Sequence, residues 1–144
     1  MTKITCTRRI EFDAAHRVLD HESKCKNLHG HRYSIEASFA VESAESLDNL
    51  GRVVDFGVIR ERLGKWVDDN WDHTTILHER DRELGENISK ITEQSIFYLP
   101  TNPTAENMAI YLLETICPPL FADAGVTCTQ IRLHETPNCS VVVD

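Results

Sequence analysis

The sequence predicts an α+β domain in which helices pack on one face of an antiparallel sheet. Two long stretches, 4–16 and 29–41, alternate apolar and polar residues with the period of a strand, while two others, 56–70 and 103–117, repeat apolar residues every three or four positions. Read in order, the elements give ββα(β)αββ. A length of 144 residues fits one domain, 1–144, with a substantial core.

The two alternating stretches both place histidine on their apolar face. Even positions of the first run from Ile4 through Phe12 to His16, interrupted only by Arg8. Odd positions of the second begin with His29 and His31 and continue with apolar residues to Val41. Two further strands are expected near the end of the chain, at about 126–135 and 139–143.

Two helices are expected between the strands. Asp55 is a suitable N-cap for the first, which ends near Asn70. Pro103 and Thr104 open the second, and Pro118–Pro119 are expected to stop it because a proline ring clashes with the preceding turn. Residues 71–93 carry few periodic cues and are predicted to be mostly loop, followed by a short strand at 95–99.

Composition excludes several classes of protein. No apolar stretch approaches the roughly 20 residues of a membrane span, and the start of the chain lacks the features of an export signal. The net charge of −8 argues against nucleic acid as a partner. Five scattered cysteines without a CxxC pair fit free thiols in a reducing cytosol. We therefore expect a cytoplasmic protein that interacts with neither membrane nor nucleic acid.

Three histidines form a candidate metal site. His29 and His31 are two apart on a predicted strand, so their side chains project from the same face, and a hairpin would bring His16 alongside. Three neutral imidazoles favour Zn²⁺ and leave a fourth position open, as in catalytic zinc sites. The alternative is that the HGH sequence is a polar start of a strand and His16 an ordinary buried histidine.

Other polar residues are candidates for proton transfer. Cys25 lies between Lys24 and Lys26, which favour its thiolate, although an inert thiol explains it equally well. Asp72 and His73 follow the first helix, where the carboxylate can orient the imidazole, but such pairs are common in ordinary loops.

Two glutamates are candidates for binding substrate. Glu135 ends a predicted strand, and its carboxylate can accept two hydrogen bonds from an amidine-like ring edge. Glu106 lies in the first turn of the second helix, where the helix dipole alone accounts for it.

Six segments spread over almost the whole chain carry a resemblance to a known family: FDAAHRV, CKNLHGHRY, VVDFGVIR, WDHTTIL, PTAENMA and LHETPN. Together they resemble the family of 6-pyruvoyltetrahydropterin and 6-carboxytetrahydropterin synthases. The resemblance implies a tunnelling fold (T-fold): an antiparallel four-stranded sheet with two helices on one face, assembling as a trimer or homohexamer with active sites between subunits. The polar stretch 79–94 is longer than in compact bacterial members.

The resemblance also implies residue roles. His16, His29 and His31 match the zinc ligands, Cys25 the general base, and Asp72 with His73 the pair that assists proton transfer. Glu135 matches the carboxylate that binds the pterin ring, and Thr104 and Glu106 match a motif near the pterin pocket.

Spacing within CKNLHGH resembles the bacterial 6-carboxytetrahydropterin synthases of deazaguanine and queuosine biosynthesis. The implied function is a zinc-dependent lyase that converts 7,8-dihydroneopterin triphosphate to 6-carboxy-5,6,7,8-tetrahydropterin, acetaldehyde and triphosphate. The alternatives are a 6-pyruvoyl synthase that eliminates triphosphate without cleaving the side chain, an aldolase-like release of a 6-hydroxymethylpterin, and a non-catalytic module stabilised by zinc. Residues 1–32 carry seven basic against four acidic side chains, so Arg17, Lys24 and Lys26 are candidates to bind the triphosphate.

Overall fold

A six-stranded sheet forms the centre of the computed structural model, which describes residues 2–144. The strand order is β4–β3–β1–β2–β5–β6. Their bounds are β1 (Ile4–His16), β2 (His29–Val41), β3 (Thr74–His78), β4 (Ile96–Leu99), β5 (Thr127–Thr136) and β6 (Cys139–Val143). The antiparallel set β1, β2, β5 and β6 is the sheet that the sequence predicts, and the α+β class is confirmed.

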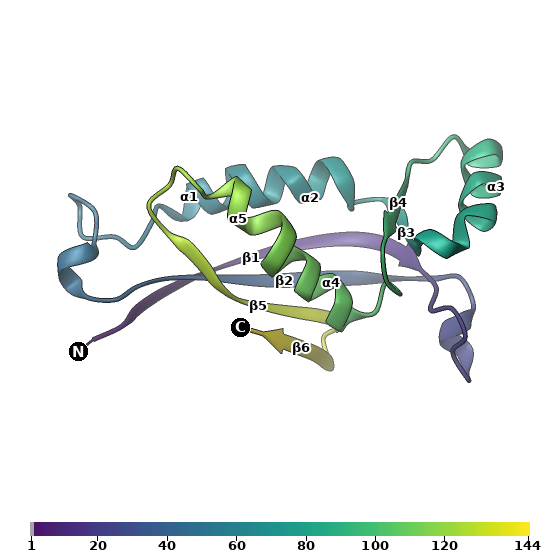
Figure 1. Cartoon of the computed structure of the whole chain (residues 1–144), viewed down its shortest axis with the longest axis horizontal. Helices are drawn as coiled ribbons and strands as arrows, with labels where there is room; N and C mark the ends of the chain where they lie inside the picture. The colour runs from purple at the N-terminus through teal and green to yellow at the C-terminus, as the bar shows by residue number, and fades with distance from the viewer. Residues whose placement is uncertain (1) are drawn as a thin grey trace.

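Two long helical segments cover one face of this sheet (Figure 1). The first comprises α1 (Phe56–Ile59), the π-turn η3 (Arg60–Gly64) and α2 (Lys65–Asn70); the second comprises α4 (Ala105–Tyr111), the π-turn η5 (Leu112–Ile116) and α5 (Cys117–Leu120). Asp55 caps the first by accepting a hydrogen bond from the Gly57 N–H at 2.8 Å. Thr104 caps the second through the Asn107 N–H at 3.1 Å. Three short 3-10 turns lie in the connections between other elements: η1 (Lys24–Lys26), η2 (Ala44–Ser46) and η4 (Glu79–Asp81).

The core lies between the sheet and these helices. Phe12 and Tyr33 are paired in the register of β1 with β2 and stack with ring centroids 5.0 Å apart. Trp71, just after α2, packs on Phe12 at 5.6 Å and is fully buried. The buried core therefore continues along both strands up to the point where the histidines begin.

The prediction that residues 71–93 are mostly loop is wrong. They contain β3 and the helix α3 (Arg82–Thr92), and β3 and β4 add to the sheet in parallel beside β1, which makes six strands instead of four. Thr75, Ile76 and Leu77 are all buried, so β3 shows no alternation in its sequence. The last turn of α3 ends at Glu93 in the left-handed region, with φ 62°, where glycine is the usual stop signal.

Pro118 and Pro119 do not stop the second helical segment, which continues to Leu120. The two prolines occupy the first turn of α5, directly after the π-turn. Proline's fixed φ of about −65° is compatible with the first turn of a helix. Within residues 2–144, no helix has the length and apolar character needed to cross a membrane.

Candidate metal centre and active site

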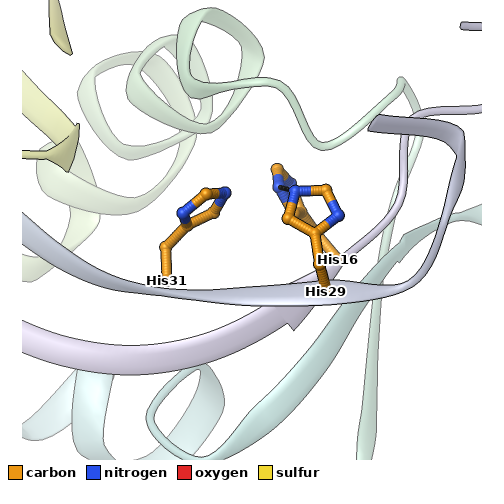
Figure 2. Close-up of side chains that lie close together, drawn as sticks. All are labelled: His16, His29 and His31. Carbon is orange, nitrogen blue, oxygen red and sulfur yellow. Dashed lines mark hydrogen bonds between the residues drawn. The ribbon is translucent and has the colours of Figure 1, made fainter. Parts of the chain in front are cut away.

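The end of β1 and the beginning of β2 bring three histidines together. His16 is paired with His29, and His31 with Ala14, so all three side chains project from the helix-covered face of the sheet. Figure 2 shows the three rings turned toward one another. The alternation seen in the sequence thus predicts this convergence correctly.

Distances within the trio suit a single ion. One ligand atom from each ring lies within 4.8 Å of the other two. Ring centroids are 4.7 Å apart for His16 and His29, 5.2 Å for His16 and His31, and 4.9 Å for His29 and His31. His16 is the deepest of the three, at 2% exposure.

The hydrogen bonds at Nδ1 of His16 and His29 leave their Nε2 atoms available to a metal. His16 Nδ1 lies 2.7 Å from the Pro103 carbonyl, and His29 Nδ1 lies 2.7 Å from the Asn27 carbonyl. Because a carbonyl only accepts, each Nδ1 carries a proton and each neutral ring keeps a lone pair on Nε2. Those two Nε2 atoms face each other at 3.2 Å, and lone pairs so placed repel unless a cation lies between them.

His31 supports the same conclusion. Its Nε2 atom is buried and has no hydrogen-bond partner within residues 2–144. Burial lowers the pKa of His16 and of His31, which keeps both rings neutral and able to bind a metal. The donor set of three imidazoles fits a divalent metal such as zinc.

Glu135, at the end of β5, lies against the trio. Its Oε1 is 3.5 Å from His31 Nε2, and its Oε2 is 3.9 Å from His16 Nε2. The side chain keeps 29% of its surface exposed. A cavity of about 210 Å³ beside it is lined by Ala105, Glu106, Glu135, Cys139, Ser140 and Val141. Both predicted substrate-binding glutamates therefore face one cavity next to the histidines.

Thr104 has a structural role in addition to its predicted place near the pterin pocket. Its hydroxyl caps α4, as described above, and its N–H donates to the Asn102 carbonyl at 2.9 Å. Glu106, two residues further, is exposed in the first turn of α4. The capping motif explains why this segment of sequence begins a helix.

Asp72 and His73 lie on the opposite face of the sheet from the trio. Their partner in β1 is Asp13, which is paired with Arg32 and so points away from the helices. The Asp72 Oδ1 atom accepts the Asp13 N–H at 3.0 Å and lies 3.1 Å from His73 Nδ1. Although burial raises the pKa of Asp72, the Asp13 N–H and His73 together hold it below its ordinary value.

The backbone at His73 is held in an uncommon conformation. Its φ is 61°, in the left-handed region, and its N–H donates to the Asp13 carbonyl at 2.6 Å. The imidazole is 76% exposed and lines an open pocket of about 410 Å³, whose other lining residues are Asp13, Ala14, Ala15, Gly30, His31, Arg32, Thr74 and Gln94. Among residues 2–144, no hydrogen bond or ion pair joins the Asp72–His73 pair to the three histidines, although His31 lines the same pocket.

Cys25 lies in η1, in the loop between the two strands that carry the histidines. It is half-buried, and its carbonyl accepts the Val18 N–H at 2.9 Å. Lys24 and Lys26 flank it with exposed side chains, as the sequence suggests. In residues 2–144 its thiol forms no hydrogen bond.

Two features of the site escape sequence reasoning. Arg17 does not have a free guanidinium: its Nε and Nη2 atoms bond both oxygens of Asp81 at 2.5 Å, and Asp81 is 5% exposed. This pairing speaks against Arg17 as a ligand for triphosphate. The backbone carbonyls of Asn27 and Pro103, which orient two of the rings, leave no signal in a sequence because any residue has a carbonyl.

Comparison with known proteins decides the family. The family model described as 6-pyruvoyl tetrahydropterin synthase matches residues 5–144. This chain belongs to that family. It is 50% identical over 140 residues to the 6-carboxy-5,6,7,8-tetrahydropterin synthase of Rickettsia conorii, covering 97% of this chain and 99% of the relative. The corresponding protein of Rickettsia bellii is 51% identical with the same coverage.

Solved structures share the fold of this chain. The uncharacterized protein WS1659 from Wolinella succinogenes superposes with a TM-score of 0.81 at 19% identity, covering 99% of this chain and 98% of that one. The Caenorhabditis elegans 6-pyruvoyl tetrahydropterin synthase gives a TM-score of 0.68 at 22% identity, with 100% and 96% coverage. The T-fold expected of a family member is thereby confirmed.

Proposed function

We propose that this chain is a zinc-dependent 6-carboxy-5,6,7,8-tetrahydropterin synthase. The observation that carries the proposal is the arrangement of His16, His29 and His31, whose ring nitrogens lie within 4.8 Å of one another while backbone carbonyls bond the Nδ1 atoms of His16 and His29. Two relatives of about 50% identity bear this name over nearly the whole chain. The substrate is a reduced pterin triphosphate, 7,8-dihydroneopterin triphosphate.

The residues around the trio divide the chemistry between them. Zinc held there would supply Lewis-acid polarisation of the substrate's side-chain hydroxyls. Glu135 would accept hydrogen bonds from the 2-amino group and N3 of the pterin, which fixes the ring in the cavity beside the histidines. Cys25 would take a proton from the substrate side chain as its thiolate.

The Asp72–His73 pair would complete the site from another copy of the chain. Both residues face away from the trio within one chain, so a proton relay that includes them requires a second subunit. We therefore propose a homo-oligomer, a trimer or a hexamer, with active sites between subunits. Asp72 would orient the His73 ring and stabilise its cationic form during proton transfer.

Product analysis tests the proposal. The zinc-loaded protein and its Cys25→Ala variant are incubated with 7,8-dihydroneopterin triphosphate, and the products are identified by mass spectrometry. Carboxytetrahydropterin with acetaldehyde, formed by the wild type and lost in the variant, would support both the reaction and the base. A pyruvoyl or hydroxymethyl product would overturn the assigned reaction while leaving the metal site, and the absence of any turnover would favour a non-catalytic zinc module.

A further inference from the structure

The turn between β4 and α4 contacts both His16 and the loop that carries Cys25. The side chain of Asn102 accepts the Leu19 N–H at 2.9 Å and donates to the Leu19 carbonyl at 3.1 Å. It thus pairs with both backbone groups of one residue 83 positions away, as a neighbouring strand would. We call this pairing of Asn102 with Leu19 the Asn102 clamp.

The clamp lies next to both groups that the reaction needs. Pro103, the following residue, supplies the carbonyl that holds His16 Nδ1 at 2.7 Å. Val18, the residue before Leu19, donates its N–H to the Cys25 carbonyl at 2.9 Å. The loop between β1 and β2 and the end of β4 lie at the same end of the sheet (Figure 1). One side chain therefore joins the turn behind the metal ligand to the loop that carries the candidate base.

The turn itself is fixed from its other side. The Asn102 carbonyl accepts the Thr104 N–H at 2.9 Å and the Asn107 Nδ2–H at 3.0 Å. These bonds tie the turn to the first turn of α4, which packs on β5 and β6. Through Asn102, the loop between β1 and β2 is therefore bonded to the helical layer. The loop needs this support because its own turn, η1, buries no residue.

We propose that Asn102 is a positioning residue, which sets the orientation of His16 and the place of Cys25 relative to it. The inference rests on the proposed metal centre and adds a residue to which no role in this site is assigned above. Removal of a group that orients a metal ligand commonly lowers the affinity for the metal by 10- to 100-fold. An amide that pairs with both backbone groups of a residue is also replaceable only by a side chain with a donor and an acceptor.

The test compares Asn102→Ala and Asn102→Asp with a matched control, Asn70→Ala. Asn70 is also partly buried, and its amide also bonds a backbone carbonyl, that of Trp66 at 2.8 Å, but within α2. Three quantities are measured: zinc affinity by competition with a chelator, the rate at which iodoacetamide alkylates Cys25 by peptide mass spectrometry, and kcat and KM with the pterin substrate.

For Asn102→Ala we expect zinc affinity to fall about tenfold. Alkylation of Cys25 should accelerate on the order of tenfold, the effect of two lost hydrogen bonds on local opening of the loop. The kcat should fall by about 10- to 100-fold with KM changed by no more than about twofold, because orientation rather than pterin binding is lost. Asn102→Asp keeps an acceptor for the Leu19 N–H but sets a second oxygen against the Leu19 carbonyl, so it should change both zinc affinity and Cys25 alkylation at least as much as Asn102→Ala. Asn70→Ala should match the wild type.

Wild-type zinc affinity and wild-type alkylation of Cys25 in Asn102→Ala would overturn the proposal, even with a lowered Tm, since a purely structural role predicts that result. Should Asn102→Ala fail to fold, Asn102→Asp decides by the same two measurements. Neither measurement requires turnover, so the clamp is tested independently of whether the wild type makes carboxytetrahydropterin.

Discussion

His16 Nε2 and His29 Nε2 face each other at 3.2 Å, while the Nδ1 atom of each ring lies against a backbone carbonyl. With both Nδ1 atoms donating to carbonyls, the two Nε2 lone pairs face each other and repel unless a cation or an extra proton lies between them. This arrangement links the sequence pattern of two strand ends to the chemistry of the proposed site.

Glu135→Gln should raise KM for the pterin by roughly 10- to 100-fold, the usual effect of losing hydrogen bonds to a charged group. The amide accepts at one atom only, so it cannot receive both ring N–H groups. Steady-state kinetics provide the measurement. Ser140→Ala alters the same cavity without removing a charge and serves as the control; equal KM values for both variants would exclude Glu135 from ring binding.

Mixing two inactive variants should restore turnover if the active site lies between subunits. Cys25→Ala keeps the Asp72–His73 pair intact, and His73→Ala keeps Cys25, so a mixed oligomer contains some sites with every group. We expect dissociated and reassociated mixtures to be more active than either parent. Mixtures as inactive as their parents would show that one chain supplies the whole site.

Charge reversal at Lys24 and Lys26 should raise KM for the triphosphate substrate, and the effect should shrink at high salt, because exposed charges are screened.

Arg17→Ala should lower stability rather than raise KM. It leaves Asp81 buried without its partner, and we expect a loss of about 2 kcal/mol of stability, less than for a fully buried pair because Arg17 is one-third exposed. Thermal unfolding separates the two effects, and an unchanged KM in the lysine variants would remove their proposed role.

Gly85→Ala should destabilise the segment that the sequence fails to predict. A Cβ at position 85 would overlap the Tyr98 hydroxyl, so α3 could no longer pack on β4 as it does. Overpacking of this kind costs about 1–3 kcal/mol. Ser89→Ala, at an exposed position of the same helix, is the control and should be neutral or slightly stabilising. Denaturant unfolding of the two variants checks this, and equal stabilities would contradict the packing described.

The sequence predicts the convergence of His16, His29 and His31 because period-two alternation fixes the face of every residue in β1 and β2. It also predicts, from local chemistry, the Asp55 cap and the start of the second helix at Pro103 and Thr104. Burial on both faces hides β3, since its side chains do not alternate. The left-handed end of α3 at Glu93 carries no glycine to mark it.

Long-range pairing explains the remaining differences between prediction and structure. Arg17 and Asp81 are 64 positions apart, and Asn102 and Leu19 are 83 apart. Neither partner predicts the other without the fold. For the same reason, the separation of the Asp72–His73 pair from the trio follows only from the strand pairing of Asp13 with Arg32.

Titration of the metal-free protein with zinc, followed by turnover of 7,8-dihydroneopterin triphosphate, tests the central claim most directly. We predict that product formation rises with added zinc and saturates at one equivalent per chain, and that His29→Ala neither binds zinc tightly nor turns over. Product formed at the full rate by the metal-free protein, or zinc bound at one equivalent and with unchanged affinity by His29→Ala, would contradict the assignment of His16, His29 and His31 as the catalytic metal site.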